Sequence, residues 1–304
     1  MNLNELDYLI KLEEEKNITK AAKKLYITPS ALNQHLHKLE EEIGTVLFVR
    51  TNEGWIPTEA GEVYLETAKR ILVMKSNAYN MIYDIASLEN NSLTIGLPPE
   101  RGTNMFTSVY PIFHKEFPNV TINLIEKSVL MQQDLISKGS IDLGFVTLMN
   151  SQKTNDNYVH IKDEELFIVL HSENPICKLA TKKRGYPYQV LSLNDIKKEA
   201  FAIMHKDSTF RHCVDELFLA ENLEPNILFE TARTRTIMNM VAANICCGVV
   251  PYAAVSHAKE NVRFFCMENR PKWGIYATYK KGNYLRAPSK RLIELATDYW
   301  NNKK

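Results

Sequence analysis

A short polar stretch of the sequence has the side-chain chemistry of a nucleic-acid contact. Within it, a hydroxyl, two amides, an imidazole and an ammonium group come from Ser30, Asn33, Gln34, His37 and Lys38. Amides and hydroxyls form hydrogen bonds with base edges, and lysine binds phosphates. Residues 16–39 also contain five lysines and no carboxylate. Because carboxylates would repel a phosphate backbone, this segregation predicts contact with DNA.

The neighbouring apolar residues predict the helices that would present these groups. Residues spaced by four, three and four positions form one helix face, which consists of Leu32, Leu36, Leu39 and Ile43. Thr28 and Pro29 suit the cap and the first position of this helix. With a preceding helix over 19–25 and a tight turn, the segment predicts a helix-turn-helix whose second helix enters the major groove. A solvated, lysine-rich helical hairpin remains an alternative.

Net charge alone would argue against DNA binding. Residues 1–90 contain ten Lys and Arg and fourteen Asp and Glu, a net charge of −4, and the whole chain carries +1. Exposed charges more than about 10 Å apart are largely screened at physiological salt. The local separation of charges is therefore more informative than their sum.

The pattern continues through an ordered set of motifs up to residue 61. The stretch AAKKLYITPSALNQHLHKLEEEIGTVLFVR, followed by PTEAG, resembles the winged helix-turn-helix of LysR-type transcriptional regulators. The matching positions are Ala21-Ala22, Leu25, Ser30-Ala31-Leu32-Asn33, Leu39-Glu40, Gly44, Leu47-Phe48-Val49-Arg50 and Thr58-Glu59-Ala60-Gly61. The resemblance implies a sequence-specific DNA-binding regulator. Its expected DNA contacts are Thr28, Pro29, Ser30, Asn33, Gln34, His37, Lys38 and Arg50.

Three positions depart from the usual pattern of this family. Asn33 replaces a serine, Gln34 stands where a basic residue is often found, and Glu53 lies at the expected wing tip. Asn and Gln pair well with adenine, whereas an acid at the wing tip predicts a weaker grip on the DNA backbone. Gly44 is expected to end the second helix in a left-handed conformation. Trp55 is expected to pack the wing against the core.

A long helix is predicted from residue 58 to about residue 88, with Thr58 as its cap. Its apolar positions alternate by four and three, with one lysine among them, at Tyr64, Ala68, Ile71, Lys75, Ala78, Ile82 and Ile85. This spacing is typical of a coiled-coil seam. The resemblance implies dimerisation through Ala68, Ile71, Lys75, Ala78 and Ile82, and a tetramer built from two dimers. Packing within a single subunit is the alternative.

The remaining two-thirds of the chain alternates between strand and helix patterns. Strands are expected over 93–97, 120–126 and 141–147, with helices between them, and the order recurs after residue 166. Such βαβαβ order predicts a parallel sheet. It resembles the two-lobed, periplasmic-binding-protein-like effector domain of the same family, and an α/β fold follows. The expected domains are 1–58 (winged helix-turn-helix), 59–90 (linker helix) and 91–304 (effector domain), with lobe 1 over 91–162 and 268–304 and lobe 2 over 163–267.

Ligands of such sheets bind beyond the carboxyl ends of strands, near helix N-termini. This rule nominates Pro98, Pro99, Arg101, Thr103, Thr147, Ser208, Thr209 and Arg235 as effector contacts. Arg101 and Arg235 have the geometry to pair with a carboxylate, so the expected effector is a small anionic metabolite, a carboxylate. Surface salt bridges are the alternative for both arginines.

Other functions have little support in the sequence. GxSxG, P-loop and HExxH motifs do not occur, and the histidines lack metal spacing, so we expect neither an enzyme nor a cofactor or metal site. A transporter's solute-binding protein is disfavoured because the N-terminus does not look like a signal peptide. No apolar run approaches 18 residues, which predicts a cytoplasmic protein without a membrane partner. The resemblance leaves contact with RNA polymerase open.

The cysteines are interpreted as reduced core residues. There are five, without a CxxC pair, although the adjacent Cys246 and Cys247 leave a redox or metal role as an alternative. The peroxide-sensing branch of the family carries a cysteine in the stretch that matches residues 205–211. This chain has none there.

Overall fold

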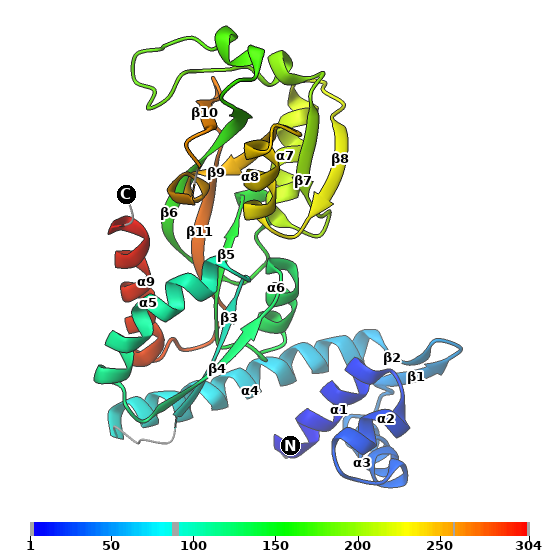
Figure 1. Cartoon of the computed structure of the whole chain (residues 1–304). Coiled ribbons are helices and arrows are strands. Elements are labelled where there is room, and N and C mark those ends of the chain that lie inside the picture. The colour runs from blue at the N-terminus through cyan, green and yellow to red at the C-terminus, as the bar shows by residue number, and fades with distance from the viewer. Residues whose placement is uncertain (1–2, 87–90, 258, 303–304) are drawn as a thin grey trace. The chain divides into compact units, whose positions relative to one another are not determined.

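A computed structural model describes residues 3–86, 91–257 and 259–302 of the chain. The chain divides into two compact units (Figure 1). One comprises Met1–Leu88 with Gly282–Arg286, and the other comprises Glu89–Lys281 with Ala287–Lys304. Among the described residues, no helix has the length and apolar character needed to cross a membrane.

The first unit is a winged helix-turn-helix followed by a long helix. Its elements are α1 (Leu3–Glu15), α2 (Ile18–Lys24), α3 (Pro29–Ile43), β1 (Phe48–Thr51), β2 (Gly54–Pro57) and α4 (Glu59–Ala86). Its core consists of Leu9, Leu12, Ala21, Ala22, Leu32, Leu36, Leu39, Leu47, Phe48 and Leu65. The predicted helix pair, wing hairpin and long helix are all present. Helix α1 was not predicted from the sequence, and its residues Leu9 and Leu12 complete the core.

Local contacts fix the ends of these elements as their residue types predicted. The Thr28 hydroxyl accepts a hydrogen bond from Ala31 N at 3.1 Å and so caps α3. Gly44 ends α3 with φ 81°. The Thr58 hydroxyl accepts from Gly61 N at 3.1 Å and donates to Val46 O at 2.7 Å. A side chain on Gly61 would place its Cβ only 2.0 Å from Leu47 O, which explains the glycine.

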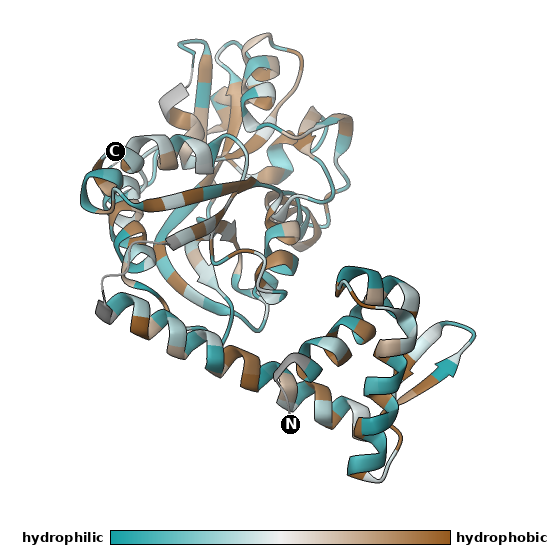
Figure 2. Cartoon of the chain, turned by 90° about the horizontal axis from the view of Figure 1, so that it is seen from below, coloured by the Kyte–Doolittle hydropathy of each residue, from teal (hydrophilic) through white to brown (hydrophobic). Residues whose placement is uncertain are grey.

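Hydrophobic and hydrophilic segments alternate along α4 (Figure 2). Ala68 is 1% exposed and packs inside the first unit, where α4 contacts α1. Ile71 is half-buried, and Lys75, Ala78 and Ile82 are exposed. On the second half of the helix, the predicted seam therefore exposes two apolar side chains, Ala78 and Ile82, together with Lys75.

Lobe 1 of the second unit contains the predicted parallel strands. Strands β3 (Asn91–Leu97), β4 (Val120–Glu126) and β5 (Leu143–Leu148) lie in the order β4-β3-β5 and are parallel. Their helices are α5 (Arg101–Glu116), α6 (Val129–Ser137) and the C-terminal α9 (Ala287–Asn302). The βαβαβ prediction is confirmed.

Two long strands connect lobe 1 with lobe 2. Strand β6 (Asn157–His171) runs antiparallel to β11 (Lys272–Tyr279). Both belong to one sheet of order β10-β6-β11-β5-β3-β4, in which β10 spans Val262–Cys266, and β9 (Gly248–Pro251) also pairs with β6. Of β6, only residues 166–170 have the apolar pattern of a strand in the sequence, and β10 (Val262–Cys266) was not predicted. The first half of β6 is rich in charged residues, so it lacks the apolar pattern from which strands are recognised.

Lobe 2 repeats the strand–helix order. Strand β7 (Ala200–Met204) pairs in parallel with β8 (Asn226–Thr231), and β9 (Gly248–Pro251) joins β6. Helices α7 (Thr209–Ala220) and α8 (Thr234–Ala242) pack on apolar clusters that include Ile168 and Phe167. The α/β class with two lobes is confirmed. The predicted domain boundaries stay a prediction.

Candidate functional site

Helix α3 presents the predicted DNA contacts on its outer side. Its apolar residues Leu32, Leu36 and Leu39 are buried in the core. Asn33 is half-buried, while the exposed members of the set are Thr28, Pro29, Ser30, Gln34, His37 and Lys38. A recognition helix needs this arrangement, in which one side packs in the core and the polar side faces solvent. Each individual base or phosphate contact stays a prediction.

Glu40 is the first acid after this set, and its carboxylate accepts hydrogen bonds from the backbone at the start of the wing. Its Oε1 accepts hydrogen bonds from Leu47 N at 2.8 Å and Phe48 N at 3.2 Å. Its Oε2 lies 3.5 Å from His37 Nδ1. Only 11% of the Glu40 side chain is exposed. The acid therefore fixes the start of the wing to α3, a role that the sequence analysis missed.

Most lysines of the acid-free stretch are exposed and have no ion pair among the described residues. Lys24 forms an ion pair with Glu15, and this hydrogen bond raises the pKa of Lys24 and lowers the pKa of Glu15. Lys20, Lys23 and Lys38 are exposed. In the described ranges they have no ion pair. The surface thus retains cations that can bind phosphates.

Tyr26 adds an aromatic group that sequence reasoning did not nominate. It lies in the turn between α2 and α3 with φ 57°, and it is 96% exposed. The hydrogen bond from Ile27 N to Ala22 O (3.1 Å) closes the end of α2 around it. A left-handed conformation is unfavourable for a bulky side chain. Its place next to α3 makes Tyr26 a candidate DNA contact.

The wing carries the remaining predicted DNA contact. Arg50 is exposed on β1 and lies opposite Trp55 of β2. Trp55 packs against the core of the first unit, as predicted, and its backbone N–H donates to Lys16 O at 2.8 Å. Glu53 is exposed between the two strands.

The second candidate site is a cavity of about 870 Å³ inside the effector unit, between its two lobes. Seven of the eight predicted effector residues line it, namely Pro98, Pro99, Arg101, Thr147, Ser208, Thr209 and Arg235. Thr103 does not line it. Two positions along a helix correspond to about 200° of rotation, so Thr103 points away from the side that Arg101 occupies. The cavity residues stay predicted effector contacts.

Two of the predicted hydroxyl groups are used by the protein itself. The buried Thr209 hydroxyl donates to Thr147 O at 2.8 Å and so joins α7 to β5. The Ser208 hydroxyl accepts from Phe210 N at 3.2 Å and caps α7. These bonds fix the wall of the cavity.

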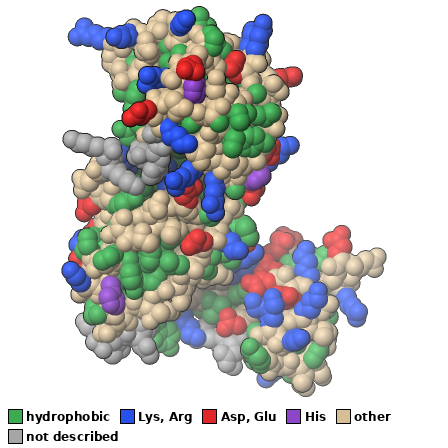
Figure 3. All heavy atoms as spheres, viewed as in Figure 1, with side chains coloured by type: hydrophobic (Ala, Val, Ile, Leu, Met, Phe, Trp, Pro, Cys, Tyr) green, Lys and Arg blue, Asp and Glu red, His purple; other side chains and the backbone are tan. Residues whose placement is uncertain are grey.

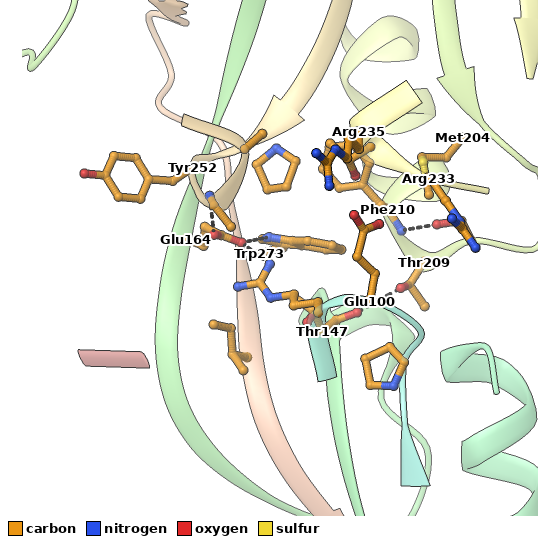
Figure 4. Close-up of a pocket in the computed structure, with 18 of the residues that line it drawn as sticks. Glu100, Thr147, Glu164, Met204, Thr209, Phe210, Arg233, Arg235, Tyr252 and Trp273 are labelled. Atoms are coloured by element: carbon orange, nitrogen blue, oxygen red, sulfur yellow. Dashed lines mark hydrogen bonds and ion pairs between the residues drawn. The ribbon is translucent and has the colours of Figure 1, made fainter. Parts of the chain in front are cut away.

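A buried carboxylate, absent from the predicted set, lies in the cavity wall beside Trp273 (Figure 4). Glu164 on β6 is 6% exposed. Its Oε2 accepts hydrogen bonds from Arg101 Nη1 at 2.5 Å and Trp273 Nε1 at 2.8 Å, and its Oε1 accepts from Ala253 N at 2.8 Å. The acid therefore connects α5, β11 and the segment after β9. A buried charge is tolerated when it is paired and hydrogen-bonded in this way.

Arg101 therefore forms a salt bridge within the protein, which was the alternative to effector binding. This salt bridge lies in the cavity wall and not on the outer surface. Arg235 differs, because it is exposed at the start of α8 beside Thr234 and Arg233. Neither Arg233 nor Arg235 has an ion pair within the described residues. Basic side chains gather near the level where the lobes meet (Figure 3).

A second charged network supports the loop between β7 and α7. Arg211 is buried and donates to Asp215 Oδ1 (2.7 Å), Met204 O (2.9 Å) and Glu230 Oε1 (2.7 Å). Burial lowers the pKa of Arg211, but the hydrogen bonds with Glu230 and Asp215 outweigh it and raise the pKa. The Arg211 hydrogen bond lowers the pKa of Glu230. Met204 lines the cavity, so this network positions part of its wall.

The thiols lack the environment of reactive cysteines. Burial raises the pKa of Cys213 to about 12, and it also raises the pKa of Cys246 and of Cys247. A protonated thiol is a poor nucleophile. Across the described ranges, no group of three or more His, Cys, Asp or Glu side chains has metal-binding geometry.

Comparisons with known proteins identify both parts of the chain. Residues 3–62 match the family described as "Bacterial regulatory helix-turn-helix protein, lysR family", and residues 86–301 match "LysR substrate binding domain". The HTH-type transcriptional regulator YwbI of Bacillus subtilis (strain 168), itself described as uncharacterized, is 27% identical over 100% of this chain and 99% of its own length.

Solved structures share the fold. A single-site variant of full-length OxyR from Pseudomonas aeruginosa has a TM-score of 0.61 at 21% identity, covering 98% of this chain and 97% of that one. Full-length CbnR, described as complexed with its target DNA, has a TM-score of 0.51 at 21% identity, covering 97% and 98%. Since the two family matches span the helix-turn-helix and the whole lobed unit, the chain belongs to the LysR family of DNA-binding transcriptional regulators, with an effector-binding domain and no enzymatic role.

Proposed function

We propose that the effector of this regulator is a small carboxylate bound between the lobes, with its anionic group on Arg235 and Arg233. The observation that carries this proposal is the pair of arginines at the start of α8, which line the cavity without ion pairs among the described residues. Guanidinium groups bind carboxylates in a bidentate manner, and the N-terminus of a helix favours negative charge. A cavity of about 870 Å³ has the size of a small-molecule site.

Effector binding is expected to change how the chain engages DNA. In this proposal α3 reads the operator and the wing contacts its backbone. Two copies associate through the side of α4 that carries the half-buried Ile71 and the exposed Lys75, Ala78 and Ile82, and two dimers form a tetramer. Ala68 supports α4 from inside its own unit. The fold that the chain shares with CbnR, which is described as complexed with its target DNA, supports the DNA part of the proposal. We also propose that the regulator is cytoplasmic and that it contacts RNA polymerase.

Fluorescence anisotropy with DNA from upstream of the chain's own gene tests the proposal. We expect preference over unrelated DNA and a steep loss of affinity as salt rises. Organic acids are then added to find those that change binding. Arg235→Ala should remove the response to the active acid, whereas Arg184→Ala, which removes an exposed arginine outside the cavity lining, should retain it. Equal responses of the two variants would contradict the role of Arg235.

A further inference from the structure

The Glu100 carboxylate extends into the cavity from a strained turn in lobe 1. Glu100 precedes α5 with φ 67° and ψ −66°, and Arg101 N donates to Pro99 O across it at 2.8 Å. This is a γ-turn with positive φ, which is rare and strained for a residue with a side chain. Figure 4 shows the Glu100 side chain rising from the lobe 1 wall toward the space beneath Arg235 and Phe210. Glu100 is exposed and has no ion pair in the described part of the chain.

The Glu100 carboxylate on lobe 1 and two arginines on lobe 2 carry opposite charges. On lobe 1, Glu164 already neutralises Arg101, whereas Glu100, beside Pro98 and Pro99, has no ion pair among the described residues. Lys162 of the same lobe also lines the cavity, and it donates a hydrogen bond to Trp300 O at 2.7 Å. On lobe 2, Arg233 and Arg235 have no ion pair within the described ranges, and the exposed Asp207 also lines the cavity there. A ligand that carried only a carboxylate would satisfy the arginines and would approach the Glu100 carboxylate at a cost.

Two largely buried aromatic rings line the cavity between the two lobes. Phe210 and Trp273 contact each other with ring centroids 4.8 Å apart, and both line the cavity. The Trp273 N–H is used by Glu164, so the indole presents mainly its apolar atoms to a ligand. An apolar part of the effector is expected to pack here.

From these observations we infer that the effector is an amino carboxylate: its carboxylate binds Arg233 and Arg235, and its ammonium group binds Glu100. Glu100 then determines specificity for the cationic group, and the strained turn holds it toward the ligand. This inference rests on the proposed function, because it adds a cationic group to the carboxylate already proposed for the cavity.

Isothermal titration calorimetry on the full-length chain tests the inference with matched pairs of compounds. Each pair consists of an amino acid and the same acid without its amino group, such as phenylalanine with 3-phenylpropanoate, leucine with 4-methylpentanoate, and 4-aminobutanoate with butanoate. For the bound pair we expect the amino member to bind more tightly by about tenfold or more, as for a hydrogen bond between charged groups.

Glu100→Gln should remove this difference by weakening only the amino member. Asp207→Asn is the matched control, because Asp207 is also an exposed acid of the cavity lining without an ion pair among the described residues, but it lies on lobe 2. The control should preserve the difference. Equal affinity within the pairs, or equal losses in both variants, would overturn the amino-group inference while leaving the carboxylate proposal intact.

The Arg235→Ala variant distinguishes a failure of the proposed function from a failure of the amino-group inference. If carboxylates of both kinds bind and Arg235→Ala weakens both, the proposed function holds, and the comparison of Glu100→Gln with Asp207→Asn decides the inference. If the wild-type chain binds acids of other kinds but no amino member of any pair, the inference fails alone. If no carboxylate binds, both fail.

Discussion

Glu164 Oε2 lies 2.5 Å from Arg101 Nη1, so the only buried acid among the described cavity-lining residues is paired with the arginine that begins α5. Arg101→Ala should therefore destabilise the effector unit by roughly 3 kcal/mol, because it leaves a buried carboxylate without its cation. Urea unfolding measures the change. Lys138→Ala removes an exposed pair with Asp134 and should cost less than about 1 kcal/mol. Similar losses in both variants would contradict a stabilising role for the buried pair.

Operator reading can be tested at Gln34, which is exposed on α3. If Gln34 pairs with one base, Gln34→Ala should cost roughly 1–3 kcal/mol at that base pair and relax the preference there. Binding is measured by anisotropy on operators with single base changes. Lys38→Ala is expected to weaken binding on all sequences and to reduce the salt slope by about one. A uniform loss for Gln34→Ala would show that it contacts only the backbone.

Association through α4 can be tested at Ile82. This side chain is 53% exposed on the predicted seam, and a charge there would be buried in the dimer. Ile82→Glu should therefore shift the chain toward monomer in size-exclusion chromatography with light scattering. Met81→Glu changes a neighbouring side chain with 45% exposure that lies off the seam, and it should leave the oligomer intact. Dissociation by both substitutions would place the interface elsewhere.

The acid sensitivity of the effector unit should depend partly on Glu230. Its hydrogen bond with Arg211 lowers the pKa of Glu230 below its ordinary value of 4.5. The stabilisation is therefore present above about pH 4.5 and is lost as the pH falls through the lowered value. Glu230→Gln should reduce stability near neutral pH and flatten its acid dependence, measured by urea midpoints from about pH 3 to 7. Glu224→Gln, at an exposed acid without a described ion pair, should retain the wild-type slope.

The thiols are expected to resist modification in the folded chain. Because burial raises the pKa of Cys213 to about 12 and also raises the pKa of Cys247, very little thiolate exists near pH 7. N-ethylmaleimide should leave Cys213 and Cys247 unmodified until urea is added, as read by mass spectrometry. Peroxide should not change operator binding. A peroxide response that disappears in Cys246→Ala would restore the redox alternative.

The sequence by itself determined the helix-turn-helix, the wing and the parallel strands of lobe 1. These elements are specified locally: Leu32, Leu36 and Leu39 mark one helix face, Thr28 caps it, and Gly44 ends it. The same local rules nominated eight effector residues, seven of which line the cavity, because strand ends followed by helix starts occur at fixed places along the chain.

Only the tertiary structure decided which side chains share the cavity and which charges remain unpaired. Arg101 and Glu164 are 63 residues apart, and their pairing depends on β6 crossing between the lobes opposite β11. The sequence predicted both Arg101 and Arg235 as carboxylate ligands. In the fold, Arg101 pairs with Glu164, whereas Arg235 has no ion pair among the described residues. Long-range contacts of this kind carry no local periodicity, so patterns of residue type cannot reveal them.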